Sequence, residues 1–398
     1  MWTEFATFSS NARSHEQFAD GLLRMSQRKK ILFVTHALES LYGAATSLRL
    51  LLENYSGIDA DLLLPRSFRH PRDLAATATR FACVRRAYEI SMPVDLGLLG
   101  IRRGLADTAH GAAHWLGWQR DRVLYRRILR NGSYDIVHFN SPALHHMLLP
   151  GLPAVTHMRD IIIDSRSPVI DKLAGGRGIV FIDAATRQPF TRRENSMHAI
   201  TLNNPIDMRE GSQRLRHPLI NQAATVFSMI GRVSELKGVH LVIEAFRLGA
   251  GADAVLVIVG AGSGDYTARC RAAASGDPRI LFWGEEENID SVYAVTDYVV
   301  RGDPAPCVGR TVYEGLYSGC RVIMPGPGQP DLIFEAARFQ DAIFFYGAGQ
   351  KNELSAVFSA RTGKKIQARQ YQSNISDYVM AFDAFIASCI PGNTSARP

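Results

Sequence analysis

The chain has 398 residues with a formal net charge of +7, and 46% of its residues are hydrophobic and 21% charged, which predicts two globular domains and excludes a disordered chain. The positive charge favours anionic partners, but zinc-finger spacing, a basic region leading into heptads and an aromatic–basic RNA-binding signature are all missing, so we expect no nucleic-acid partner. The five cysteines are scattered without a Cys-x-x-Cys pair and no apolar run is long enough to span a bilayer, which predicts a cytoplasmic protein.

The first half of the chain predicts a parallel sheet. Residues 1–30 form a polar extension of no clear structural type. Short apolar segments rich in β-branched residues then recur at intervals that leave room for helices, and they start at Ile31, Asp61, Asp135, Ala154 and Gly178. Continuous apolar strands of this kind are typical of a sheet covered by helices on both faces. We therefore expect a Rossmann-like domain over residues 31–203.

An arginine-rich segment, residues 98–130, interrupts this pattern. Its arginines are Arg102, Arg103, Arg120, Arg122, Arg126, Arg127 and Arg130, and they are interleaved with Leu116, Trp118, Val123, Leu124 and Leu129. Helical spacing of the charges is compatible with an interfacial helix on an anionic membrane, at its inner face. The alternative is an amphipathic helix packed on its own domain with a solvated basic face.

The second half repeats the alternation. A strand ends in turn-forming residues at 201–207, and apolar segments then start at Thr225, Ala254, Arg279, Asp297, Cys320 and Ala342. This predicts a second Rossmann-like domain over residues 204–364. Residues 365–398 are expected to form a helix that can return to the first domain, followed by a tail.

Two loops of the second half carry the most informative chemistry. In the first, a strand ends at Gly231 and a helix begins near Gly238, which places Arg232 and Lys237 on one loop. Ligands collect at the carboxyl ends of parallel strands, where helix N-termini offer unpaired N–H groups. Two cations there suit a diphosphate, although two exposed loop cations without a ligand are the plain alternative.

The second loop opens a helix at about Gly309. Backbone N–H groups of Val308, Gly309, Arg310 and Thr311 would face a phosphate, and Glu314 lies one turn into the helix, where its carboxylate can accept from two ribose hydroxyls. Glu314 can equally serve only to compensate the helix N-terminus. A third, glycine-rich loop at residues 260–265 starts with Gly260 and permits close approach of a ligand to the backbone.

Together these segments resemble the second domain of retaining glycosyltransferases of family 4, which have the GT-B fold of two Rossmann-like domains facing each other across a cleft. The resemblance implies that Arg232 and Lys237 bind the donor diphosphate, that residues 308–311 form its phosphate-binding helix start, and that Glu314 binds the donor ribose. Residues 203–207 resemble the turn with which the family enters its second domain.

The first domain extends the resemblance. Gly43 takes the place of one of two adjacent glycines of the family, and the other position holds Tyr42. The histidine that the family places at the reaction centre falls on His157. A lone histidine at a strand end is otherwise usually structural, so its assignment depends on the resemblance.

One position departs from the family. Its first motif glutamate, which holds the donor sugar, is replaced by Pro306, whose side chain cannot accept a hydrogen bond. Either sugar specificity differs, or a group such as Asp303 substitutes, or activity is lost. The diphosphate contacts should survive the change.

The resemblance implies transfer of a sugar from a UDP- or GDP-linked donor to a saccharide or glycolipid hydroxyl, with retention and without a metal or separate cofactor, in bacterial surface polysaccharide or glycoconjugate synthesis. A non-catalytic partner of another transferase and a sugar-nucleotide epimerase of the same fold are the alternatives. Asp59-Ala60-Asp61 spells the metal-holding pattern of other transferases, and we interpret it as a turn.

Overall fold

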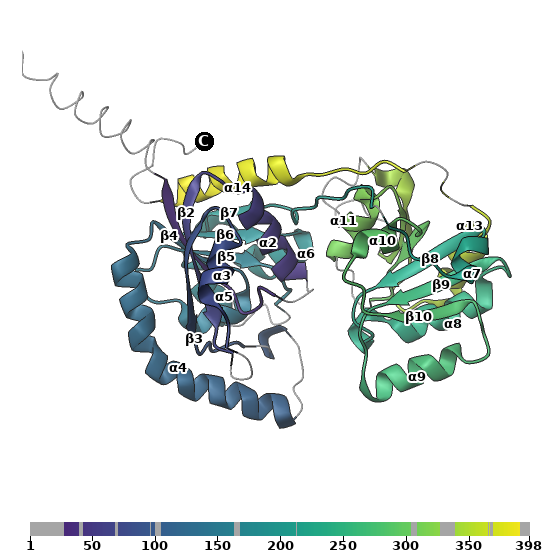
Figure 1. Cartoon of the computed structure of the whole chain (residues 1–398), viewed down its shortest axis with the longest axis horizontal. Coiled ribbons are helices and arrows are strands. Elements are labelled where there is room, and N and C mark those ends of the chain that lie inside the picture. The colour runs from purple at the N-terminus through teal and green to yellow at the C-terminus, as the bar shows by residue number, and fades with distance from the viewer. Residues whose placement is uncertain are drawn as a thin grey trace, which may run out of the picture.

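The computed structural model describes residues 28–39, 43–67, 71–95, 97–99, 105–162, 168–211, 213–303, 309–326, 339–364, 366 and 369–390, with the side chains of 99 and 105–110 outside this description. The described residues form two α/β lobes joined by two chain segments (Figure 1).

The first lobe contains a seven-stranded sheet in the order β3-β2-β1-β4-β5-β6-β7, in which every neighbouring pair is parallel. Its strands are β1 (Lys29–Val34), β2 (Ile58–Pro65), β3 (Val84–Ile90), β4 (Ile136–Phe139), β5 (Ala154–Met158), β6 (Gly178–Phe181) and β7 (Ala199–Thr201). Ile31 and Phe33 of β1 point into one apolar cluster while Leu32 and Val34 point into another, because successive side chains alternate across a sheet. Both faces are therefore buried.

Helices cover these two faces. They are α2 (Gly43–Asn54), α3 (Leu74–Thr79), α4 (Leu105–Gly132), α5 (Pro168–Ala174) and α6 (Ala184–Arg187), with 3₁₀ turns η1 (Gly97–Leu99), η2 (Pro142–Met147) and η3 (Gln188–Ser196). Leu48 and Leu51 of α2 pack on one face, and Trp118 and Tyr125 of α4 pack on the other.

The second lobe has a six-stranded parallel sheet in the order β10-β9-β8-β11-β12-β13. Its strands are β8 (Thr225–Ile230), β9 (Ala254–Val259), β10 (Ile280–Gly284), β11 (Tyr298–Val300), β12 (Arg321–Pro325) and β13 (Ile343–Tyr346). Its helical elements are α7 (Pro218–Gln222), η4 (Glu235–Lys237), α8 (Val239–Gly249), α9 (Gly264–Ala274), α10 (Ile289–Tyr293), α11 (Arg310–Tyr317), η6 (Gln340–Ala342) and α13 (Lys351–Arg361).

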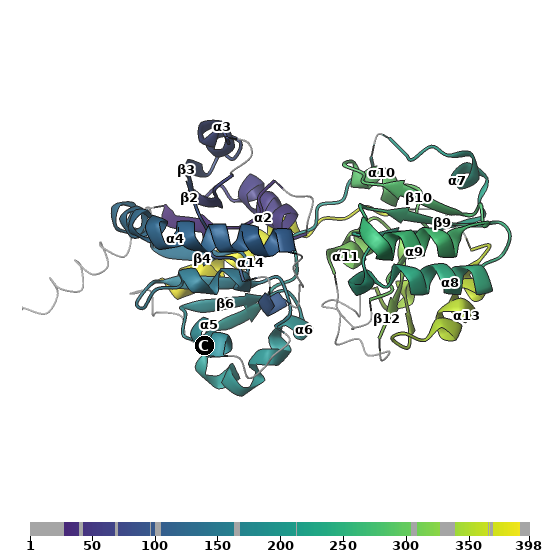
Figure 2. The ribbon, with the colours of Figure 1, turned by 90° about the horizontal axis from the view of Figure 1, so that it is seen from below.

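The last helix, α14 (Ile375–Cys389), returns to the first lobe. Phe382, Phe385 and Ile386 are buried in the cluster that also contains Ile31 and Leu48. The two segments that join the lobes run side by side, linked by an antiparallel bridge between Asp207 and Ser373 (Figures 1 and 2). The predicted architecture of two Rossmann-like domains is confirmed.

Two local features differ from the predictions. The sequence analysis missed β3, because this edge strand is charged and only its ends, Val84 and Ile90, are buried. The interpretation of Asp59-Ala60-Asp61 as a turn was wrong, because both aspartates lie within β2. Asp61 is buried and accepts a hydrogen bond of 2.6 Å from the Tyr134 hydroxyl, which explains why a carboxylate is tolerated there.

Candidate functional site

Three loops of the second lobe meet at the carboxyl ends of β8, β9 and β11. Gly260, with φ of 140°, lies so close to the loop after β8 that a Cβ there would be 2.1 Å from the carbonyl oxygen of Gly231. Gly238, with φ of 64°, lies against the end of β11, where a Cβ would be 1.7 Å from the oxygen of Gly302. Only glycine allows these approaches, so the glycines of the predicted phosphate loops assemble one site.

Lys237 is the cation that the structure places at the centre of this site. Its ammonium lies 3.3 Å from a carboxylate oxygen of Asp303, and its side chain is 37% exposed. The other oxygen of Asp303 accepts from the guanidinium of Arg301, and both of these side chains are 4% exposed. Arg232, on the same loop as Lys237, is exposed. Lys237 therefore has a buried anchor and an outward-facing charge.

The start of α11 lies beside the same group of charges. Gly309 is the N-cap of α11, without a side-chain cap, and a Cβ there would be 2.4 Å from Nη1 of Arg301. The N–H groups of Arg310 and Thr311 belong to the first turn, where no intrahelical acceptor is available. Two other predicted positions, Pro306 and Val308, lie outside the described residues.

Glu314 is held on both carboxylate oxygens. Oε1 accepts from Nε of Arg310 at 2.6 Å, and Oε2 accepts from the hydroxyl of Tyr293 at 2.8 Å. Burial, and then the charge of Glu314, raises the pKa of Tyr293 well above its ordinary value, so the hydroxyl remains a donor. Each carboxylate oxygen has two acceptor sites, so both can still accept from a further hydroxyl.

Arg310 joins the two lobes. Its Nη1 donates to the hydroxyl of Ser47 on α2 at 3.0 Å and to the carbonyl of Pro205 in the first joining segment at 2.6 Å. A Cβ added to Gly43, at the start of α2, would lie 3.5 Å from the Arg310 side chain. Glu314 is thereby fixed relative to the first lobe. Tyr42, which stands where the family has its other glycine, lies outside the described residues.

His157 lies inside the first lobe. Its side chain is fully buried on β5, stacked on Phe382 of α14, with Nδ1 3.4 Å from Nε2 of His138. Burial, and then the charge of Arg159, lowers the pKa of His157 well below its ordinary value. The imidazole is therefore neutral and covered in this conformation, and its place at the reaction centre stays a prediction.

Arg159 is the residue that the sequence analysis missed. It follows the carboxyl end of β5, is 8% exposed, and donates to the side-chain oxygens of Asn204 at 2.6 Å and Asn140 at 3.2 Å. Its Nη2 has no hydrogen-bond partner within the described part of the chain. Burial lowers the pKa of Arg159, and the interaction with Tyr378 opposes this shift only in part.

The signal for Arg159 was available but ambiguous. Arg159 stands two residues after His157, and side chains two residues apart in a strand point to the same face of the sheet. The two side chains diverge only if the strand ends between them. The strand ends at Met158, and this end turns Arg159 toward the joining segment.

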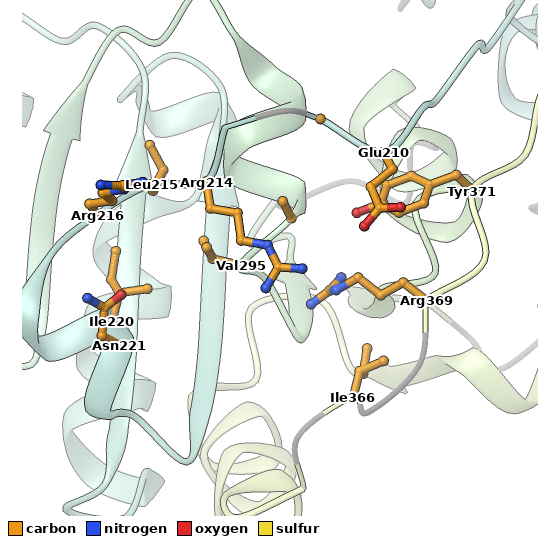
Figure 3. Close-up of a pocket in the computed structure, with 12 residues that line it drawn as sticks. Glu210, Arg214, Leu215, Arg216, Ile220, Asn221, Val295, Ile366, Arg369 and Tyr371 are labelled. Carbon is orange, nitrogen blue, oxygen red and sulfur yellow. The ribbon is translucent and has the colours of Figure 1, made fainter.

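A hollow of about 830 Å³ lies elsewhere in the second lobe. It is lined by residues that precede β8 and β11 and by Ile366, Arg369 and Tyr371 of the segment after α13. The hollow therefore opens at the amino edge of the sheet, opposite the phosphate loops. Figure 3 shows Arg214 and Arg369 turned toward one another there, with Glu210 beside Tyr371. This hollow takes no part in the predicted donor site.

The arginine-rich segment forms much of α4. Trp118 is buried in the core, whereas Trp115, Leu116, Val123 and Leu124 are exposed. The described arginines Arg120, Arg122, Arg126, Arg127 and Arg130 are exposed as well. Arg102 and Arg103 lie outside the described residues. Among the helices of the described residues, none has the length and apolarity to cross a bilayer.

Comparison with known proteins agrees with this arrangement. Residues 214–338 match the model of the family described as glycosyl transferases group 1, which supports a relation to glycosyltransferases. A search of curated proteins finds no match.

Solved structures share the fold over nearly the whole chain. HepE from Anabaena, in complex with UDP and glucose, has a TM-score of 0.65 at 16% identity, covering 91% of this chain and 100% of its own. Sucrose-phosphate synthase from Thermosynechococcus elongatus has a TM-score of 0.61 at 13% identity, covering 90% and 96%. A glycosyltransferase from Rickettsia africae has a TM-score of 0.59 at 13% identity, covering 92% and 100%. The fold is GT-B.

Proposed function

We propose that this protein transfers a sugar from a nucleoside diphosphate sugar to a hydroxyl of a saccharide or glycolipid acceptor, with retention and without a metal. The observation that carries the proposal is the contact between the Lys237 loop and the residues after β11, made by Asp303 and by the approach of Gly238 to Gly302. Arg301, which holds Asp303, in turn lies against Gly309 at the start of α11. The match to glycosyl transferases group 1 covers these residues. HepE is solved with UDP-glucose, which makes UDP the first nucleotide to test and GDP the second.

The donor diphosphate would lie between the charges of Arg232 and Lys237 and the N–H groups that start α11. These groups would stabilise the negative charge that develops on the diphosphate as the sugar departs. Each charge-assisted hydrogen bond contributes about 1.5–3 kcal/mol, whereas a helix terminus adds about 0.3–1 kcal/mol. The two side chains would dominate donor binding. Glu314 would accept from the ribose hydroxyls with its remaining acceptor sites.

Asp303 supports the donor site by holding Lys237. Its two oxygens are occupied by Lys237 and Arg301, and the side chain is 4% exposed. A carboxylate so placed orients cations more readily than it accepts from a sugar. We infer that Asp303 positions Lys237 and does not replace the sugar-binding glutamate of the family.

The first lobe would contribute Arg159 to the reacting groups. Its buried guanidinium has an unpartnered Nη2 among the described residues and lies on the network that reaches Arg310 through Asn204 and Ser47. Asp160 and Tyr378 offset part of its burial, but a buried donor left without an acceptor is costly unless it meets one during the functional cycle. We infer that Arg159 faces the donor or acceptor when both are bound.

Product analysis tests the proposed activity. The purified protein is screened for thermal stabilisation by UDP, GDP and their sugars, and the stabilising donor is incubated with and without saccharide or glycolipid acceptors. A new glycoside that requires an acceptor, with the donor's anomeric configuration, supports the proposal. A changed sugar without acceptor would instead identify an epimerase, and an unchanged donor that still binds would identify a non-catalytic partner.

A cytoplasmic enzyme of bacterial surface polysaccharide or glycoconjugate synthesis would meet lipid-linked acceptors at the inner face of the membrane. The exposed Trp115, Leu116, Val123 and Leu124 beside the exposed arginines of α4 support such a contact. Co-sedimentation with anionic vesicles at low salt, and its loss with neutral vesicles, is the expected result. Equal recovery with both kinds of vesicle would exclude charge-driven contact.

A further inference from the structure

Three ligand-type side chains converge at the carboxyl edge of the first sheet, on elements that carry none of the phosphate loops. Asp95 comes from the loop after β3, and His145 and His146 are consecutive in η2, which follows β4. The backbone N–H of Asp95 donates to the carbonyl of Ala143 at 2.9 Å, which ties the two loops together. The ligand atoms of the three side chains all lie within 4.8 Å of one another.

The spacing of these atoms suits one metal ion. Zinc binds imidazole nitrogen and carboxylate oxygen at about 2.0–2.2 Å, so neighbouring ligand atoms around a tetrahedral ion lie roughly 3.5 Å apart. Oδ2 of Asp95 is 3.2 Å from Nε2 of His145 and 4.0 Å from Nε2 of His146. These distances bracket the expected value, so small side-chain rotations would complete the set.

The carboxylate of Asp95 is already oriented for this role. Its Oδ1 accepts from the backbone N–H of Leu98 at 3.2 Å, which leaves Oδ2 directed at the histidines. Trp115 of α4 packs edge-on against His146, with ring centroids 5.1 Å apart, and fixes that imidazole. Hydrogen bonds and packing of this kind hold the ligands of known metal sites in place.

Two of the three ligand side chains are open to solvent. Asp95 and His146 are 35% and 37% exposed, so an ion can reach them from solvent.

We propose that Asp95, His145 and His146 form a site for one divalent cation of the zinc class. Two histidines and one carboxylate leave at least one coordination position open, as in catalytic rather than closed structural sites. The open position would take water or an oxygen of a bound molecule. The site belongs to the first lobe and is independent of the donor site, so its test uses metal binding and requires no enzyme activity.

Calorimetric titration with Zn²⁺ tests the proposal on tag-free protein that has been treated with chelator and dialysed. The wild type should bind one Zn²⁺ per chain, and D95N, H145Q and H146Q should each weaken binding at least about tenfold. The matched control is H240Q, because His240 also lies 3.8 Å from a carboxylate, that of Glu244, but without a third ligand. This control should bind Zn²⁺ like the wild type.

Fluorescence gives a second reading of the same site. Ni²⁺ should quench the emission of Trp115 in the wild type, and the quenching should be smaller in H146Q and in W115F. His146 is partly exposed, so H146Q should remain folded. Absence of saturable Zn²⁺ binding by the wild type, or equal affinity in H146Q and the wild type, would overturn the proposal.

Discussion

Replacement of Lys237 by methionine isolates the charge at the centre of the proposed donor site. Methionine keeps most of the aliphatic length and removes the ammonium. The change should leave the fold intact, because the Lys237 side chain is 37% exposed and its replacement leaves no buried cavity. Asp303, which would lose this partner, keeps the guanidinium of Arg301.

The expected loss of donor affinity follows from one charge-assisted contact to the diphosphate. Such a contact is worth about 1.5–3 kcal/mol. This corresponds to a rise in the dissociation constant for UDP, or for GDP if that nucleotide is preferred, of roughly 10- to 150-fold. A nucleoside without phosphates lacks the contact, so any affinity for it should change little.

Calorimetry on the wild type and K237M measures this difference, and thermal unfolding checks the fold. K351M is the matched control, because Lys351 is 44% exposed and also forms an ion pair, 3.5 Å from Glu244 on α8, with a carboxylate that is 41% exposed. K351M should bind the nucleotide like the wild type. If K237M does so as well, the diphosphate does not contact Lys237 and the proposed donor site is wrong.

Three further changes test other parts of the structure. Arg159→Lys keeps the charge but not the planar guanidinium, so we expect turnover to fall at least about tenfold with little change in nucleotide affinity, and an unaltered rate would remove Arg159 from the reacting groups. Gly238→Ala should lower the free energy of unfolding by about 3 kcal/mol or more, because the added Cβ would meet the backbone of Gly302. Gly264→Ala is the control: this glycine also has a positive φ, 73°, but no neighbour within 4 Å, so the change should cost about 1 kcal/mol. Similar urea midpoints for the two variants would contradict this. Burial lowers the pKa of His138 to about 3 and that of His157 well below its ordinary value, so below about pH 6.5 the unfolded chain binds more protons than the folded chain. The free energy of unfolding should therefore fall with acid, by up to about 1.4 kcal/mol per pH unit for each histidine. Urea unfolding between pH 7.5 and 5 should show a shallower pH dependence in H138N than in the wild type.

The sequence alone determined the class of fold and the positions of the glycine-containing loops that we propose bind the donor. Continuous apolar strands at regular intervals require a parallel sheet covered on both faces, and this pattern is local, so it can be read residue by residue. The glycines around Arg232 and Lys237 mark loops at strand ends for the same reason: only glycine adopts the backbone of Gly238 and permits its approach to Gly302.

Only the tertiary structure decided which side chains face one another. Whether His157 or Arg159 turns toward the second lobe depends on whether β5 ends before or after Arg159, a difference of one residue. It also depends on α14, which covers His157 although it lies more than two hundred residues further along the chain. The approach of Asp95 to the two histidines likewise depends on the contact between the loop after β3 and η2, two segments that are distant along the chain. Local propensity carries no information on such contacts, because they form between segments distant along the chain whose positions are set by how the sheet and its helices pack.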